Sequence, residues 1–200
     1  MRPTSVVGIL LAAGSGVRFG GAKLLARLPS HEAGGECVGV VACRHLIAAI
    51  PDVIAVVRSN DAALAVALGA AGAQVVRCDN ADEGMGASLA CGVLAMPQAV
   101  GWVVALADMP WIAPGSIARV AAAIAAGARV AAPFHGGLRG HPVGFGRACY
   151  RELAALTGDT GAKAVVAAHR DALVRIDIDD PGILRDVDRL ADLAGAPRAS

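Results

Sequence analysis

Short apolar segments, separated by turns that contain glycine or proline, recur along the whole chain. Residues Val6 to Ala12 form one continuous apolar run, and a run of this length predicts a buried β-strand. Similar runs predict further strands at residues 53–57, 73–76, 102–107 and 173–177, and a strand on each side of a glycine-rich turn, at 130–133 and 142–145.

Helices are predicted between and after these strands. The pattern places them at residues 38–50, 61–71, 85–95, 114–126, 147–156, 161–169 and 183–193. Strands that alternate with helices favour a three-layer α/β/α fold, in which a mostly parallel central sheet is covered on both faces. We expect one domain over residues 1–200, with a frayed tail at 195–200.

The composition fits such a core and argues against several classes of partner. Hydrophobic residues make up 56% of the chain and aromatic residues 3%, so the core must consist of Ala, Val, Leu and Ile. The net charge of +1 gives no electrostatic reason to expect nucleic acid or an acidic membrane as a partner. The five cysteines include no C-x-x-C pair, which favours reduced thiols and a cytoplasmic location.

The first residues also resemble a short signal peptide, because Arg2 is followed by an apolar run and then by Ala-Ala-Gly. We reject that interpretation because the run has the length of a strand and leads directly into the most motif-like part of the chain. No apolar span reaches the roughly 18 residues of a transmembrane helix.

The glycine-rich loop after the first predicted strand matches neither of the common nucleotide-binding fingerprints. Phe19 stands where the dinucleotide motif needs glycine, and Leu24 stands where the Walker motif needs Ser or Thr. The loop still offers closely spaced backbone N–H groups, and Arg18 and Lys23 add two cations, which is typical of a phosphate-binding turn. The alternative is a glycine-rich turn with two solvated cations.

Six motifs follow one another in a recognisable order. They are Leu11-Ala12-Ala13-Gly14-x-Gly16-x-Arg18-x-Gly20-Gly21-x-Lys23, Glu83-Gly84-Met85-Gly86-Ala87-Ser88-Leu89, Leu106-Ala107-Asp108-Met109-Pro110, Gly140-His141-Pro142-Val143, Gly158-Asp159-Thr160-Gly161-Ala162-Lys163 and Asp177-Ile178-Asp179-Asp180-Pro181. The ordered set resembles the MocA-like molybdenum cofactor cytidylyltransferases, within the MobA-like NTP transferase superfamily. The resemblance implies a Rossmann-like, GT-A-like nucleotidyltransferase fold.

The resemblance also implies roles for matched residues. Arg18, Lys23 and Asp108 would be catalytic, and Asp108 and Asp179 would hold Mg²⁺, with Asp177 and Asp180 as competitors of Asp179. The acceptor would be bound by His141 and Pro142. The nucleotide would be bound by Leu11, Ala12, Ala13, Gly14, Ser15, Gly16, Arg18, Lys23, Gly84, Ser88 and Asp108.

Structural roles compete with several of these assignments. Asp108 could instead be a turn residue at the end of a strand, and Asp179 a helix cap, although the metal role is favoured for both. Ser88 also fits the first turn of a helix, and His141 also fits an exposed turn. The chain departs from the family pattern at residues 27–36, where the polar segment is longer than the corresponding segment of the family.

The implied reaction is the magnesium-dependent transfer of a nucleoside monophosphate from a triphosphate to a phosphorylated acceptor, with release of pyrophosphate. Ala12-Ala13-Gly14 resembles the cytidylyl branch, which favours CTP, and the family favours the molybdopterin cofactor as acceptor. One alternative acceptor is a sugar phosphate. A second alternative is a non-catalytic carrier or maturation chaperone, which would bind the cofactor and a client molybdoenzyme.

Overall fold

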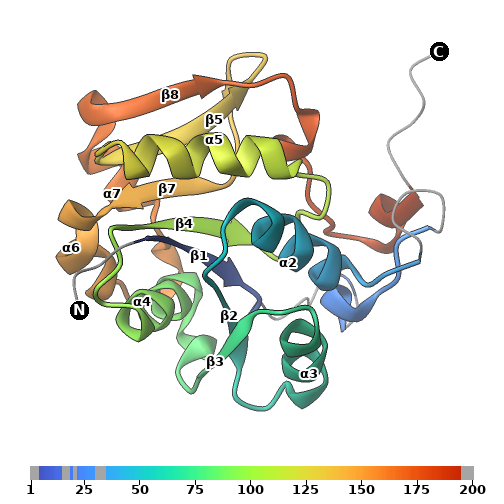
Figure 1. Cartoon of the computed structure of the whole chain (residues 1–200). Coiled ribbons are helices and arrows are strands. Elements are labelled where there is room, and N and C mark those ends of the chain that lie inside the picture. The colour runs from blue at the N-terminus through green and yellow to red at the C-terminus, as the bar shows by residue number, and fades with distance from the viewer. Residues whose placement is uncertain (1–4, 15–18, 20–21, 30–34, 195–200) are drawn as a thin grey trace.

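A sheet of eight strands runs through the part of the chain that the structure, a computed structural model, describes: residues 5–14, 19, 22–29 and 35–194. Its order is β3-β2-β1-β4-β7-β5-β6, and β8 pairs with β5 (Figure 1). The strands are β1 (Val6–Leu11), β2 (Val53–Arg58), β3 (Gln74–Cys78), β4 (Gly101–Leu106), β5 (Val130–His135), β6 (Leu138–Arg139), β7 (Val143–Gly146) and β8 (Leu173–Asp177).

The directions of the strands divide the sheet into two parts. In one part, β3, β2, β1 and β4 are all parallel, with Leu11 in register with Val56 of β2 and Leu106 of β4. Beyond β4 the strand β7 is antiparallel to both β4 and β5, while β8 is parallel to β5. The parallel part brings the carboxyl ends of β1, β2 and β4 to one edge of the sheet, where ligands of α/β folds bind.

Helices cover both faces of the sheet. They are α2 (Val38–Ala49), α3 (Ala62–Ala70), α4 (Met85–Ala95), α5 (Pro114–Ala125), α6 (Tyr150–Ala154) and α7 (Lys163–Ala168). The helices α2, α3 and α5 share one hydrophobic cluster with one face, and α4, α6 and α7 share a second cluster with the other. None of the described helices is both long and apolar enough to cross a bilayer.

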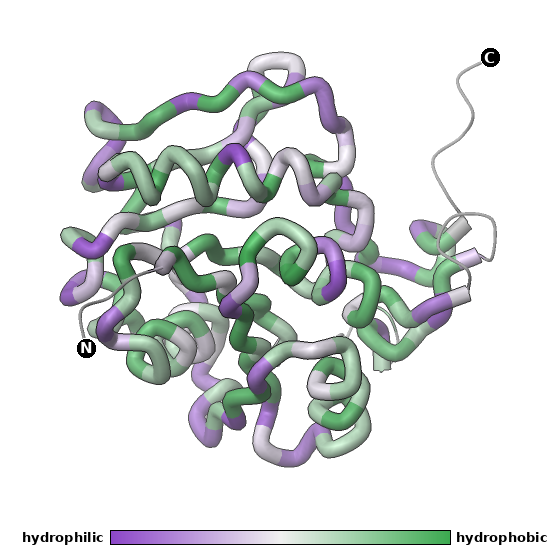
Figure 2. The backbone as a smooth tube through the Cα atoms, in the orientation of Figure 1, coloured by the Kyte–Doolittle hydropathy of each residue, from purple (hydrophilic) through white to green (hydrophobic). Residues whose placement is uncertain are grey.

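Each inner strand supplies side chains to both clusters, because successive residues of a strand point to opposite faces. In β1, Val7 and Ile9 lie in the cluster with α4, whereas Leu10 lies in the cluster with α2. A strand buried on both faces must be apolar at every position, which explains the continuous runs in the sequence. Figure 2 shows the resulting hydrophobic colour along these strands and on the helices that cover them.

The mostly parallel sheet between two helical layers confirms the expected fold class. The helix expected over residues 183–193 is wrong. The described chain forms short 3-10 helices at Pro181–Leu184 and Leu190–Ala194, and residues between them are not helical. The reason is tertiary: the N–H of Val187 donates to the carbonyl of Asp108 over 2.9 Å, and the Val187 side chain is fully buried. The expected tail at 195–200 lies outside the described residues.

We predict that Gly101→Ala destabilises the fold by about 1–3 kcal/mol, because overpacking strains a dense core. Gly101 opens β4, and a Cβ atom there would lie 2.6 Å from the carbonyl oxygen of Phe145 and would also overlap Ile124. Urea unfolding measures the change. The matched control is Gly115→Ala in α5, where a Cβ meets nothing within 4 Å and should raise stability by up to about 1 kcal/mol. Equal effects of the two substitutions would contradict the packing at β4.

Candidate active site

The first part of the site is the turn that follows β1. The N–H of Ala12 donates to the carbonyl of Val56 over 2.9 Å, and the Nε of Arg58 donates to the carbonyl of Ala13 over 2.8 Å. The end of β2 therefore fixes the start of the glycine-rich loop. The predicted loop residues Ser15, Gly16 and Arg18 lie outside the described residues.

The second part joins this loop to β4. Lys23 begins a 3-10 turn, Lys23–Leu25, which is anchored by the buried side chain of Leu24. Its Nζ donates to the Oδ2 of Asp108 over 2.8 Å and lies 3.7 Å from the Oδ1 of Asp188. The side chain of Lys23 is 13% exposed, so this contact is shielded from water more than a surface ion pair is.

Three carboxylates meet next to Lys23. Asp108, Asp186 and Asp188 each offer an oxygen within 4.8 Å of the others. The pKa of Asp186 is raised, because partial burial and the charges of Asp188 and Asp108 disfavour its ionised form. The backbone hydrogen bond from Val187 to Asp108 holds this concentration of negative charge in place.

The carboxylate group fits a divalent cation. The Oδ1 of Asp108 is buried and has no hydrogen-bond partner among the described residues, although a buried carboxylate oxygen normally has one. Magnesium and manganese prefer oxygen ligands, and magnesium in phosphate sites uses one or two carboxylates. A cation bound there would give that oxygen a partner and would offset the repulsion among the three side chains.

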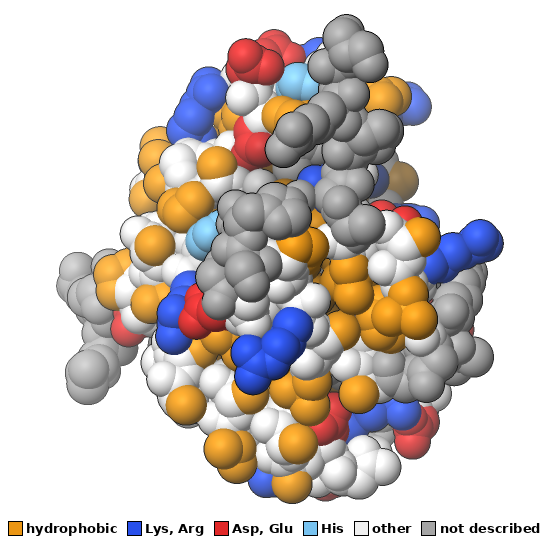
Figure 3. Space-filling view, turned by 90° about the vertical axis from the view of Figure 1, so that its right-hand side faces the viewer, with side chains coloured by type: hydrophobic (Ala, Val, Ile, Leu, Met, Phe, Trp, Pro, Cys, Tyr) orange, Lys and Arg blue, Asp and Glu red, His pale blue; other side chains and the backbone are white. Residues whose placement is uncertain are grey.

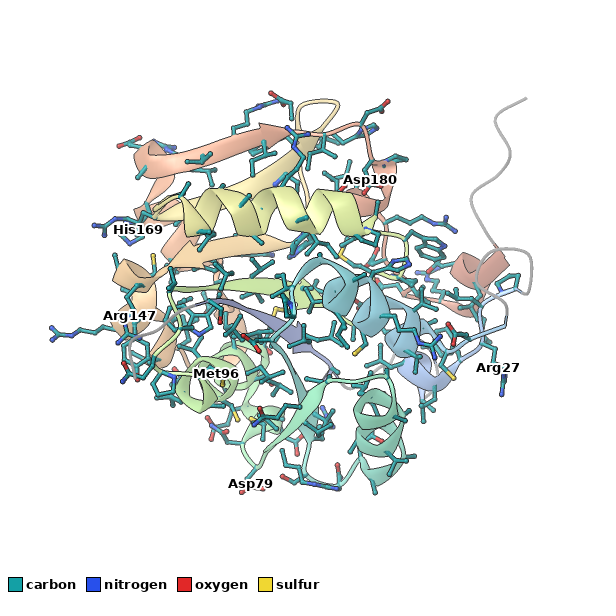
Figure 4. All side chains as sticks on the ribbon, viewed as in Figure 1. Arg27, Asp79, Met96, Arg147, His169 and Asp180 are labelled. Atoms are coloured by element: carbon teal, nitrogen blue, oxygen red, sulfur yellow. The ribbon has the colours of Figure 1, made fainter. Side chains whose placement is uncertain are left out.

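The other acidic residues proposed from the sequence lie elsewhere. The carboxylate of Asp177 accepts from Arg175, and that of Asp179 is fully exposed, 3.8 Å from His135. Asp180, labelled in Figure 4, accepts hydrogen bonds at the start of α5 from the Ser116 hydroxyl (2.6 Å) and from the N–H of Ala113 (2.9 Å).

None of Asp177, Asp179 and Asp180 belongs to the carboxylate group around Asp108. The sequence repeats the Asp-aliphatic-Asp spacing nine residues later, at Asp186-Val187-Asp188, and the fold brings this second copy to Asp108. The repeated spacing is a signal in the sequence that could have pointed to this second pair. The helix wrongly expected over 183–193 concealed it.

A pocket of about 360 Å³ opens beside Lys23 and Asp108. Figure 3 views the molecule from the side where β1 and β4 end, and both acidic and basic side chains are exposed on that face. Ala12 lines an adjoining pocket of about 300 Å³. Of the residues expected to bind nucleotide, the larger pocket is lined by Leu11, Ala13, Gly14, Lys23, Gly84, Ser88 and Asp108.

Close packing forms the wall of this pocket at the start of α4. Gly84 has a φ of 129°, and a Cβ there would lie 2.5 Å from the carbonyl carbon of Gly158 and would overlap Asp159. The position therefore requires glycine. The hydroxyl of Ser88 donates to the Gly84 carbonyl over 3.2 Å, so Ser88 combines a place in the wall with the helix-start role that the sequence also allowed.

Sequence reasoning missed Arg58, Asp82 and Asp159, which also line the pocket. Arg58 pairs with Asp82 over 3.0 Å while it holds the Ala13 carbonyl. One partner of Arg58 is a backbone carbonyl 45 residues earlier, and the other is a side chain in a short 3-10 turn. No local motif therefore marks Arg58 as part of the site. Asp159 lies in one of the six motifs, but the motif by itself gave it no role in the site.

His141 lies outside the lining of this pocket. Its Nδ1 is buried without a hydrogen-bond partner among the described residues, and Pro142 next to it is buried. Burial lowers the pKa of His141, and Arg139 and Lys163 lower it further, while Asp108 acts in the opposite direction. The imidazole is therefore favoured in its neutral form, within electrostatic reach of the carboxylate group.

The sheet edge, the loop and the acidic group together have the architecture of a Rossmann-like nucleotidyltransferase. The model of the MobA-like NTP transferase domain matches residues 8–173, and the chain belongs to that family. A comparison with curated proteins gives no match.

Solved structures resemble the chain over nearly its full length. Rv0371c from Mycobacterium tuberculosis H37Rv is 28% identical, with 97% of each chain covered and a TM-score of 0.81. A manganese complex of Rv0371C from the same organism is 26% identical, with coverage of 96% and 97% and a TM-score of 0.76. A nucleotidyl transferase from Methanothermobacter thermautotroptrophicus is 23% identical, with coverage of 96% and 95% and a TM-score of 0.79.

We predict that the protein binds Mn²⁺ and that Asp108→Asn and Asp188→Asn each weaken this binding by at least tenfold. Each substitution replaces a charged ligand by a neutral amide in the only acidic group of this kind among the described residues. Titration followed by electron paramagnetic resonance measures free and bound Mn²⁺. Asp179→Asn is the matched control and should bind normally, because Asp179 is exposed and lies outside the group. Loss of Mn²⁺ binding in Asp179→Asn alone would contradict the assignment of the metal site to the carboxylate group around Asp108.

Proposed function

We propose that the protein is a magnesium-dependent nucleotidyltransferase that transfers the nucleotidyl group of CTP to a phosphorylated acceptor, and that this acceptor is the molybdopterin cofactor. One observation carries the proposal: Lys23 and the carboxylates of Asp108, Asp186 and Asp188 converge, and Lys23 and Asp108 line a pocket at the ends of β1 and β4. The choice of CTP and of molybdopterin rests on the motif resemblance, including Ala12-Ala13-Gly14.

Different residues of the chain would bind the nucleoside and the phosphates of the triphosphate. The nucleoside would occupy the pocket between Leu11, Ser88 and Arg58, with the phosphates toward Lys23 and Asp108. Arg58 fixes the Ala13 carbonyl and so preorganises the start of the loop. Lys23 carries a compact ammonium that can exchange its contact with Asp108 for phosphate oxygens. Metal held by Asp108 with Asp186 or Asp188 would supply Lewis-acid neutralisation of the triphosphate.

The transfer itself needs no covalent enzyme intermediate. An oxygen of the acceptor phosphate attacks the α-phosphorus, the bond from the α-phosphorus to the bridging oxygen breaks, and pyrophosphate leaves with that oxygen. No proton has to move, because a phosphate monoester is largely ionised at neutral pH. The contribution of Lys23 would be electrostatic, because its positive charge would offset the negative charge that accumulates on the leaving group.

The direct test is incubation of the purified protein with Mg²⁺, the molybdopterin cofactor and each of CTP, GTP, ATP and UTP. Pyrophosphate release and product mass are the readouts. The proposal expects a cytosine dinucleotide with CTP and little product with the other nucleotides. Product with GTP alone would overturn the nucleotide assignment. Pyrophosphate release only with a sugar phosphate would overturn the acceptor, and cofactor binding without turnover would favour a carrier.

We predict that Lys23→Ala and Asp108→Asn each lower kcat by roughly 10²- to 10³-fold, as expected for loss of one preorganised electrostatic group. Circular dichroism and thermal unfolding establish that the variants are folded. Arg170→Gln, which removes an exposed charge in a 3-10 turn far along the chain, is the control and should retain full activity. Wild-type rates in both site variants would show that the loop and the carboxylates do not act together.

A further inference from the structure

The segment that carries Asp186 and Asp188 lies along the loop that follows β4. We call residues 180–188 the strap and residues 108–116 the β4 loop. The strap contains one short 3-10 turn, Pro181–Leu184. Such turns have poor hydrogen-bond geometry and do not by themselves fix the residues that follow. Contacts outside the strap therefore have to fix the place of its two carboxylates.

The first of these contacts is made by Asp180, at the beginning of the strap. Its Oδ2 accepts hydrogen bonds from the Ser116 hydroxyl over 2.6 Å and from the Ala113 N–H over 2.9 Å, and its Oδ1 accepts one from the Gly182 N–H over 2.9 Å. The Ser116 side chain is buried, and Ala113 is the N-cap residue of α5, where the helix dipole favours a carboxylate. Both oxygens of Asp180 are thus engaged in tying the strap to the first turn of α5.

The second contact is a stack between Arg185 and Trp111. The guanidinium carbon of Arg185 lies 3.4 Å from the centre of the Trp111 ring, which is a cation–π contact. The backbones also approach closely, because a Cβ at Gly182 would overlap the Trp111 carbonyl oxygen and lie 2.6 Å from the carbonyl carbon. Trp111 follows Asp108 by three residues along the β4 loop. Arg185 immediately precedes Asp186 on the strap, so the stack joins the two segments within a few residues of the carboxylates.

The strap and the β4 loop run in opposite directions, and their contacts form a series. The series ends with the hydrogen bond from Val187 to the Asp108 carbonyl over 2.9 Å. Asp186 and Asp188 flank Val187 and meet the Asp108 carboxylate at that end. Each contact limits where the following residues of the strap can lie, so the series holds like charges together against their repulsion.

We propose that Asp180, Trp111 and Arg185 are positioning residues of the metal site, which hold the strap on the β4 loop and bring its two carboxylates to Asp108 without themselves binding the cation. The assignment rests on the metal site of the proposed function and extends it to residues outside that site. Docking of the strap and binding of a cation then favour each other, because the cation relieves the repulsion that docking concentrates. The apparent metal affinity falls with the fraction of molecules in which the strap is docked.

The first test measures Mn²⁺ affinity by electron paramagnetic resonance, with the metal alone as the probe. Asp180→Asn, Trp111→Leu and Arg185→Gln should each weaken Mn²⁺ binding by about three- to tenfold, because each lowers the docked fraction. Trp111→Phe keeps an aromatic face for Arg185 and should bind Mn²⁺ within about twofold of wild type. The matched control is Arg147→Gln, which removes a cation–π contact 4.9 Å from the centre of the Tyr150 ring and should bind normally. Figure 4 shows Arg147 at the left of the view and Asp180 at the upper right, far from each other.

The second test uses the wild-type protein, so it does not depend on how the variants fold. Hydrogen exchange measured by mass spectrometry should slow about tenfold in peptides of the strap when Mn²⁺ saturates the protein, because docking protects its N–H groups. Peptides of α6, which packs on the opposite face of the sheet from Ile183 and Val187 of the strap, should exchange at the same rate with and without metal.

Three outcomes would overturn the positioning role. One is unchanged Mn²⁺ affinity in all three strap variants. Another is exchange of the strap that does not respond to saturating Mn²⁺. The third is a loss of affinity in Trp111→Phe as large as that in Trp111→Leu, since only the second substitution removes the aromatic face.

The transfer assay separates failure of this assignment from failure of the proposed function. Arg185→Gln should raise the Mg²⁺ concentration for half-maximal rate about three- to tenfold and regain a kcat within about twofold of wild type at saturating Mg²⁺, whereas Asp108→Asn stays slow. Wild-type metal dependence in Arg185→Gln would overturn the positioning role and leave the function intact. Metal binding that depends on the strap, without any transfer, would overturn the function and leave the positioning role intact.

Discussion

The backbone hydrogen bond between the N–H of Val187 and the carbonyl of Asp108 is the constraint on which the rest of the site depends. Three carboxylates repel one another, and the chain would separate them unless something stronger held their segments together. The buried Val187 side chain and this hydrogen bond supply that restraint, and Lys23 adds a cation within 4 Å of two of the three carboxylates. The fold thus stabilises a concentration of negative charge that a divalent cation would relieve.

The topology explains why the site has two unequal sides. Strands β1, β2 and β4 are parallel and end at one edge, where the loop after β1 and the pocket beside α4 are built. Beyond β4, the antiparallel strand β7 and its neighbours bring the 139–142 segment to the same region. Asp108, which follows β4, therefore stands where the two parts of the sheet meet.

Local patterns were sufficient for the parts of the site made by consecutive residues. A fully buried strand followed by a glycine-rich turn predicted the place of Lys23, and an apolar strand ending in Asp-Met-Pro predicted Asp108. The failures have a common cause. Asp186 and Asp188 lie on a segment whose apolar spacing suits a helix, but a contact with residue 108 holds it in another conformation. Arg58 donates a hydrogen bond to a backbone carbonyl 45 residues away, and such a contact cannot be predicted from the residue types around Arg58.

The distribution of lysine and arginine sets two positions of the chain apart. The chain has 18 basic residues, and only Lys23 and Lys163 are lysines. Both occur in the tripeptide Gly-Ala-Lys, one in the loop after β1 and the other at the start of α7. A compact ammonium can turn its three donors toward whichever oxygens arrive, whereas a guanidinium presents its donors in a rigid planar fork. An ammonium can therefore follow phosphate groups that change their bonding during a transfer, and this is the role proposed for Lys23 beside Asp108.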